Sequence, residues 1–228
     1  MELIIYALAP VAVVIFYIYL KDKYEKEPKR LLIISFLLGA IVSIIITTLL
    51  YGIFKLALPL TNSLSVFQQF VQAFFVVGFS EELSKYLIVL FFAQRNKAFN
   101  EPFDGIVYAV MVSMGFAATE NIMYVMDSGA TTALLRAFTA IPAHATFGIL
   151  MGYFMGKAKF SNNRMFLNLT GLGLAILFHG AYDFFLFIDF IPGIWVGAFV
   201  SLIIGIILSR KAIKKHQVAS HFKEEIDF

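Results

Sequence analysis

The sequence contains no cysteine and few charged residues, and both absences narrow its chemistry. Without cysteine the chain has no disulfides, no thiolate nucleophile and no thiolate metal ligand. Charged residues make up 14% of the chain, and a net charge of +3 gives no indication of nucleic-acid binding. The short alternating segments of a transmembrane barrel are also missing. No basic run precedes the first apolar segment, so we expect that segment to be retained rather than cleaved as a signal peptide.

Apolar residues, in contrast, are abundant. They make up 60% of the chain, which has a mean hydropathy of +0.83. They fall in runs of about 20 residues, the length that crosses a hydrocarbon core about 30 Å thick. We therefore expect an all-α, polytopic transmembrane bundle of about seven spans, at residues 2–20, 31–57, 66–93, 103–126, 131–156, 165–190 and 192–210. Short connections indicate one integral-membrane domain, residues 1–210, and a basic cytoplasmic tail, residues 211–228.

Basic residues give this bundle an orientation, because lysine and arginine concentrate in cytoplasmic loops. Fifteen of the 18 basic residues fall in the first, third and fifth predicted loops and in the tail, in groups of five, two, three and five. Seven spans place all these segments on one side. The sequence therefore predicts an outer N-terminus and a cytoplasmic C-terminus, with three basic residues as exceptions: Lys55, Lys85 and Arg136.

The third predicted span is unusually long and is interrupted by Gly78-Phe79-Ser80. Ser80 could cap a helix that begins at Glu81, where the helix dipole favours anions. Such a broken helix would present polar groups near the bilayer midplane. A continuous tilted helix is equally compatible with the sequence.

Seven polar or charged side chains lie within four of the apolar spans. An ionisable group at bilayer depth is costly, so its presence indicates a function or a partner. Counted at about 1.5 Å per residue, the acids and imidazoles fall between the midplane and the outer face. The sequence therefore predicts one polar site in the outer half of the membrane, formed by Glu81, Glu82, Lys85, Glu120, His144, His179 and Asp183.

Helical spacing pairs several of these residues. Lys85 lies one turn after Glu81 and can also reach Glu82, but a single ammonium neutralises only one carboxylate. The other is left desolvated beside a like charge, which is the environment of a general base. His179 and Asp183, four residues apart, share a helix face on which the aspartate can orient the ring. Each pair also has a structural interpretation, as a polar contact that joins helices.

The fourth and fifth spans carry the remaining motifs. Small residues such as Gly115 allow close helix approach before Glu120 and Asn121, which form either part of the site or an interhelical hydrogen-bond clamp. In the fifth span, Pro142 can kink the helix beside His144. Three glycines at four-residue spacing follow as a packing stripe: Gly148, Gly152 and Gly156.

The order of these motifs resembles the order found in the PrsW family of bacterial intramembrane proteases. The resemblance covers residues 1 to about 210 and rests on Glu-Glu-x-x-Lys, Asp-Gly-Ile-Val-Tyr, Gly-Phe-Ala-x-x-Glu-Asn, a histidine in a glycine-rich helix and His-Gly-x-Tyr-Asp. Residues 19–28 are similar to the first cytoplasmic loop of that family. More distantly, the chain resembles the CAAX-prenyl protease and bacteriocin-immunity (CPBP) superfamily, which also has a double-glutamate motif and two separate helical histidines.

This resemblance implies a multi-pass peptidase of the bacterial cell membrane. It would make the first, extracytoplasmic cut in a single-pass anti-sigma factor, after which a second intramembrane protease completes release of the sigma factor. Glu81 would activate water with the support of Glu82, His144 would hold that water, and His179 with Asp183 would stabilise the oxyanion. The other supporting residues expected are Lys85, Glu120 and Asn121.

The residues leave the metal question open. Two histidines and a carboxylate satisfy the ligand set of a catalytic zinc site. No His-Glu-x-x-His motif is present, so such a site would combine His144 and His179 with a carboxylate of Glu81, Glu120 or Asp183 across helices. Similarity to the CPBP superfamily favours a metal-independent glutamate mechanism, with no cofactor, over a zinc enzyme.

Two other function classes also place acids and histidines in a membrane. A proton- or cation-coupled transporter relays protons along such residues, but we see no internal repeat of the kind transporters show. A non-catalytic membrane scaffold or immunity protein could retain the same fold, although intact Glu81, His144 and His179 argue against it. An endopeptidase that acts in the lipid bilayer, without a nucleic-acid partner, is the main hypothesis.

Overall fold

The computed structural model describes residues 2–220 and 222, and this part of the chain is helical with no strand. Seven helical segments follow one another and correspond to the seven predicted spans, which confirms the all-α fold class. Their elements are α1 (Glu2–Lys21); α2 (Lys29–Leu38), η1 (Gly39–Ser43) and α3 (Ile44–Ala57); α4 (Val66–Val71), η2 (Gln72–Gly78), α5 (Phe79–Ile88) and η3 (Val89–Ala93); α6 (Pro102–Ser128); α7 (Ala130–Phe138) and α8 (Ala140–Lys159); α9 (Arg164–Phe187); and α10 (Val196–Val218).

Six of these segments are long and apolar enough to cross a membrane. The segment from α4 to η3 is not one of the six: its first half contains three glutamines, and its second half contains the charged residues Glu81, Glu82 and Lys85. Large apolar side chains such as Leu56 and Phe67 are exposed on the outside of the bundle, as a lipid environment requires. The chain is a multi-pass helical membrane protein.

The third segment is continuous rather than broken at Gly78. Gly78 has ordinary helical dihedral angles, φ −56° and ψ −46°, and Ser80 lies inside the helix and caps nothing. The π-helical stretch η2 precedes the charged run instead of a break. A Cβ atom on Gly78 would lie 3.2 Å from the backbone nitrogen of Gly180, so the glycine allows α9 to approach closely.

The fifth span is divided at Thr139, where the backbone leaves the helical region with φ −123° and ψ −78°. Pro142 lies in the first turn of α8, a position where its missing N–H removes no helical hydrogen bond. The chain therefore changes direction between α7 and α8, three residues before the proline, and Pro142 does not kink α8 beside His144 as predicted. This change sets the direction of α8 and places His144 in the second turn of that helix.

The last helix extends beyond its predicted end. α10 continues to Val218, and Ala212, Ile213 and His216 are buried, so the predicted tail begins as packed helix. Gln217 donates to the backbone carbonyl of Lys21 at 2.5 Å, which joins this end to the first loop. The charges of this segment lower its hydropathy without ending the helix. A domain boundary at residue 210 stays a prediction, and residues 221 and 223–228 lie outside the described part.

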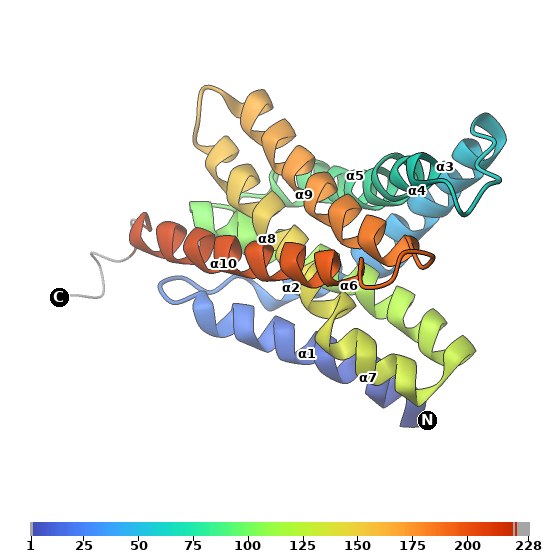
Figure 1. The fold of residues 1–228 in the computed structure, drawn as a ribbon. Coiled ribbons are helices and arrows are strands. Elements are labelled where there is room, and N and C mark those ends of the chain that lie inside the picture. The colour runs from blue at the N-terminus through green and yellow to red at the C-terminus, as the bar shows by residue number, and fades with distance from the viewer. Residues whose placement is uncertain (1, 221, 223–228) are drawn as a thin grey trace.

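The segments rich in basic residues gather at one end of the bundle. Figure 1 shows the connections after α1, η3 and α8 and the end of α10 on the left, and the N-terminus with the connections after α3, α6 and α9 on the right. This arrangement is the one that seven spans require. The orientation, with the N-terminus outside, stays a prediction.

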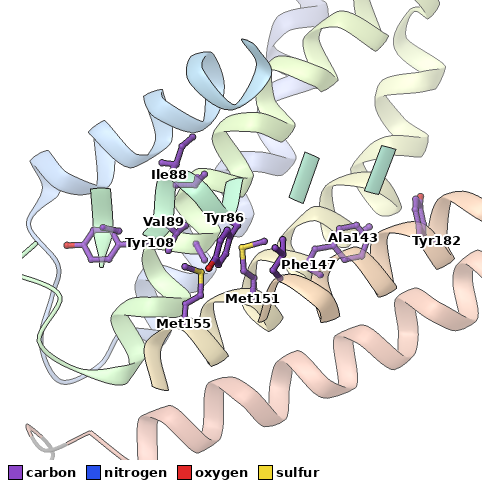
Figure 2. Close-up of a cluster of buried hydrophobic side chains, with 14 of the residues drawn as sticks. Tyr86, Ile88, Val89, Tyr108, Ala143, Phe147, Met151, Met155 and Tyr182 are labelled. Carbon is purple, nitrogen blue, oxygen red and sulfur yellow. The ribbon is translucent and has the colours of Figure 1, made fainter. Parts of the chain in front are cut away.

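Helices α6 and α8 form the centre of the bundle and touch through glycine. A Cβ atom on Gly152 would lie 2.3 Å from the carbonyl oxygen of Gly105, and one on Gly156 would lie 2.0 Å from that of Pro102. The predicted glycine stripe is therefore a helix-packing face. Beside it a buried apolar cluster extends from Tyr108 and Met155 to Phe147 and Tyr182 (Figure 2).

The loop between α1 and α2 is packed against the bundle rather than solvated. Asp22 and Glu27 are 1% and 2% exposed. Burial raises the pKa of Asp22 to about 6 and that of Glu27 to about 7, because the ionised carboxylates lose their hydration. Tyr108 on α6 donates a hydrogen bond to Glu27 and anchors the loop.

Candidate active site

All seven polar residues predicted to form one site lie together. Glu81, Glu82 and Lys85 come from α5, and the other four come from α6, α8 and α9: Glu120, His144, His179 and Asp183. A cavity of about 540 Å³ borders them. Glu81, Glu120, His144, His179 and Asp183 line it, whereas Glu82 and Lys85 are buried and absent from its wall.

Lys85 lies between the two glutamates instead of pairing with one. Its Nζ is 3.3 Å from Glu81 Oε2 and 2.7 Å from Glu82 Oε1. The same Nζ lies 3.4 Å from His144 Nδ1 and 4.1 Å from the centre of the Phe116 ring. The ammonium is thus surrounded by groups that attract a positive charge.

His179 has a carboxylate at each ring nitrogen. Its Nδ1 is 2.8 Å from Glu82 Oε1, and its Nε2 is 3.3 Å from Asp183 Oδ2 and 3.9 Å from Glu81 Oε2. The ring stacks on Phe147 with 4.8 Å between the ring centres. The predicted contact between His179 and Asp183 is present, and Glu82 adds a second support that fixes the ring.

His144 is held by Glu120, which was assigned in the sequence either to the site or to a clamp. Glu120 Oε2 lies 2.9 Å from His144 Nε2 and 2.6 Å from Arg136 Nη2, so it links the site to α7. Asn121 has a different place. It accepts from Arg136 Nε at 2.7 Å and donates to the carbonyl of Ala7 at 2.8 Å, and it thereby clamps α1 to α6 and α7.

Two residues of this site were missed in the sequence. Tyr51 on α3 donates to Glu81 Oε1 at 2.8 Å. Arg136, described above, was detectable as one of three basic residues outside the predicted cytoplasmic segments. Tyr51 gives no such signal, because a tyrosine near the end of a span is typical of the membrane interface.

The site carries more negative than positive fixed charge. Its four carboxylates face two permanent cations, Lys85 and Arg136. Burying uncompensated charge is costly, so the missing positive charge has to be supplied by protons bound at the site or by a cation.

The donor set fits a zinc ion in its chemistry. One ligand atom from each of Glu81, Glu82, His144 and His179 lies within 4.8 Å of the others, and zinc is commonly bound by histidine and carboxylate. Glu82 Oε2 is buried without a hydrogen-bond partner among the described residues. This cluster contains Glu82, which was not among the predicted ligands, and leaves out Glu120 and Asp183.

The cavity extends from the site toward one end of the bundle. Its wall includes Tyr51, Met123 and Phe187, near the ends of α3, α6 and α9 that lie opposite the basic segments. In the predicted orientation this is the outer end. A polypeptide that approaches from that side would meet Glu81 and both histidines.

A multi-pass helical bundle whose buried carboxylates and imidazoles border a cavity is the arrangement expected of a membrane-embedded hydrolase. The chain belongs to the PrsW family of intramembrane metalloproteases, whose family model matches residues 27–209, and it is a membrane-embedded peptidase. It is 39% identical to the "Protease PrsW" of Oceanobacillus iheyensis over 78% of this chain and 80% of the relative. The proteins of the same name in Geobacillus kaustophilus and Clostridioides difficile are 35% and 37% identical, over 87% and 83% of this chain and 86% and 81% of their own lengths. No solved structure matches the chain.

Proposed function

We propose that this peptidase makes the first cut in a membrane-anchored anti-sigma factor, on its extracytoplasmic side, and thereby starts activation of a sigma factor. The observation that carries the position of the cut is the cavity, which joins Glu81, His144 and His179 to the predicted outer end. The order of the family motifs supports the substrate class. A cell membrane of a bacterium is the expected location, since the relatives named above are bacterial.

In the proposed reaction, Glu81 acts as the general base. It lines the cavity, and Tyr51 and Lys85 fix its two oxygens. Glu81 takes a proton from a water molecule as the water oxygen bonds to the scissile carbonyl carbon. The same proton then passes to the leaving nitrogen as the carbon–nitrogen bond breaks.

The two histidines have separate roles in this proposal. Glu120 orients His144, which holds the attacking water beside Glu81. Glu82 accepts from Nδ1 of His179 and holds the ring, while the Nε2 N–H, 3.3 Å from Asp183, turns from that carboxylate to the negative charge that develops on the carbonyl oxygen. Glu82 is then a positioning residue for His179, since it does not line the cavity.

The same residues could also hold a metal ion. The description of the family as metalloproteases favours a metal-dependent mechanism over the metal-independent one. Glu81, Glu82, His144 and His179 would hold the ion. Zinc supplies Lewis acidity to a bound water or carbonyl. The roles of Glu81, His144 and His179 described above belong to the metal-independent form, which stays the alternative and in which Lys85 provides the fixed positive charge beside the glutamates.

Membership of a protease family also favours the endopeptidase over the other two classes considered, a coupled transporter and a non-catalytic scaffold or immunity protein. Cleavage can be tested by co-expressing the chain with a single-pass anti-sigma factor in a bacterial membrane. Glu81→Gln and His144→Ala should reduce cleavage by about 10²-fold or more. Asp127→Asn, at an exposed acid on α6, is the matched control and should cleave normally. Equal cleavage by all variants at equal expression would exclude the assignment.

Metal dependence needs a separate experiment on purified protein. After chelation and dialysis, a zinc enzyme loses activity and regains it with added zinc. Full activity with less than one zinc per chain would instead support the metal-independent form.

A further inference from the structure

A second acidic cluster lies far from the proposed active site. Glu25 and Glu27 belong to the loop between α1 and α2, and Asp104 lies in the first turn of α6. One carboxylate oxygen from each lies within 4.8 Å of the others. Asp104 is 16 residues before Glu120 on α6, which separates the two sites by about 24 Å.

This region concentrates buried oxygens that lack partners. Eleven buried side-chain nitrogen or oxygen atoms in the described chain have no hydrogen-bond partner. Five of them come from Asp22, Glu25, Glu27, Asn100 and Asp104. Glu27 is 2% exposed and Asp104 is fully buried, so water does not solvate these oxygens freely.

Each of the two buried acids uses only one oxygen to hold the fold. Asp104 Oδ2 accepts the backbone N–H groups of Asn100 and Glu101 at 2.7 and 2.8 Å, which caps α6. Glu27 Oε2 accepts from Tyr108. The second oxygens, Glu27 Oε1 and Asp104 Oδ1, have no donor from another residue as a partner, and the two carboxyl groups interact with each other.

Basic side chains of the described residues compensate these acids only from a distance, as Lys159 does for Asp104. Neither Glu25, Glu27 nor Asp104 forms an ion pair there with lysine or arginine. Lys26 is the adjacent cation, but its ammonium donates to the backbone carbonyls of Tyr19 and Asp22. The cluster therefore needs either a shared proton or a bound cation.

We propose that Glu25, Glu27 and Asp104 bind a divalent cation that prefers oxygen ligands, Mg²⁺ or Ca²⁺. Carboxylates without nitrogen or sulfur donors are the ligands such ions take. The ion joins the first loop to the start of α6, at the end of the bundle that carries the basic segments. The bound ion stabilises the packing of this loop against α6 and is separate from the hydrolytic site.

Mn²⁺ is a suitable probe, because electron paramagnetic resonance measures its free and bound forms directly. The experiment uses full-length protein in detergent, freed of metal with a chelator, and carrying Glu81→Gln and His144→Ala to disable the other candidate metal site. We expect one bound Mn²⁺ per chain, displaced by Mg²⁺ or Ca²⁺. Adding Glu27→Gln or Asp104→Asn should weaken binding roughly tenfold or more, whereas adding Asp127→Asn should not change it.

Absence of stoichiometric binding up to about 1 mM Mn²⁺ would overturn the proposal and indicate a shared proton. Binding that is unaffected by both substitutions would overturn it as well. Where a buried variant fails to fold, Glu25→Gln gives the same test at a partly exposed ligand. Whichever of Mg²⁺ and Ca²⁺ displaces the probe at lower concentration identifies the preferred ion.

Discussion

The contact between α6 and α8 gives a sharp prediction, because these helices meet backbone to backbone. A Cβ atom added in Gly152→Ala would lie 2.3 Å from the carbonyl oxygen of Gly105 and 2.8 Å from Ile106 Cα. Real Cβ contacts are not shorter than 3.0 Å, so the closest pair has to separate by at least about 0.7 Å. Neither atom belongs to a flexible side chain, so the helices themselves have to move.

The expected cost follows from this displacement. Overpacking of a close-packed core costs about 1–3 kcal/mol of unfolding free energy. The same helix pair carries Glu120 and His144, whose 2.9 Å contact holds one of the two histidines. A misplacement of about 1 Å in an active site can reduce the rate by about 10²-fold. Gly152→Ala should therefore lose both stability and peptidase activity.

Gly173→Ala is the matched control on α9. A Cβ atom there meets nothing within 4 Å, and alanine favours the helix over glycine by up to about 1 kcal/mol. Thermal unfolding in detergent and cleavage at equal expression should therefore separate the two variants. If Gly152→Ala unfolds at the same temperature as Gly173→Ala and cleaves normally, the close contact between α6 and α8 determines neither the stability of the protein nor the geometry of the active site.

Three further substitutions test the polar contacts. Tyr51→Phe removes the hydrogen bond to Glu81 and should slow cleavage roughly tenfold with little change in thermal unfolding; an unchanged rate would remove Tyr51 from the site. Glu120→Gln removes the charge that orients His144, and about 10- to 100-fold lower activity is expected in the same assay, with a normal rate contradicting that role. Gln94→Leu loses hydrogen bonds to a backbone carbonyl of α8 and to two side chains of α9. Thermal unfolding should show a loss of about 3 kcal/mol in unfolding free energy. A loss below about 1 kcal/mol would show that other contacts replace these hydrogen bonds.

Hydropathy and charge placement were sufficient to predict the helical segments and the end at which the basic loops gather. Helical rise was then sufficient to predict that Glu81, His144 and His179 meet, because depth in a membrane restricts position to a layer. The backbone break at Thr139 and the extension of α10 to Val218 depend on packing between helices, which no local pattern records. Tyr51 was missed for the same reason, since its partner is 30 residues away on another helix.

The charge balance of the site explains why its polar residues are more than a structural clamp. A clamp is favourable when each buried charge has a partner, as the triad of Glu120, Arg136 and Asn121 illustrates. Around Glu81 and Glu82, in contrast, a single ammonium is shared by two carboxylates, and one oxygen of Glu82 has no partner within the described chain. Protons or a cation have to balance the charge of these two glutamates, and either can serve the hydrolysis of a peptide bond. Metal content measured together with activity therefore distinguishes the two ways in which this site can work.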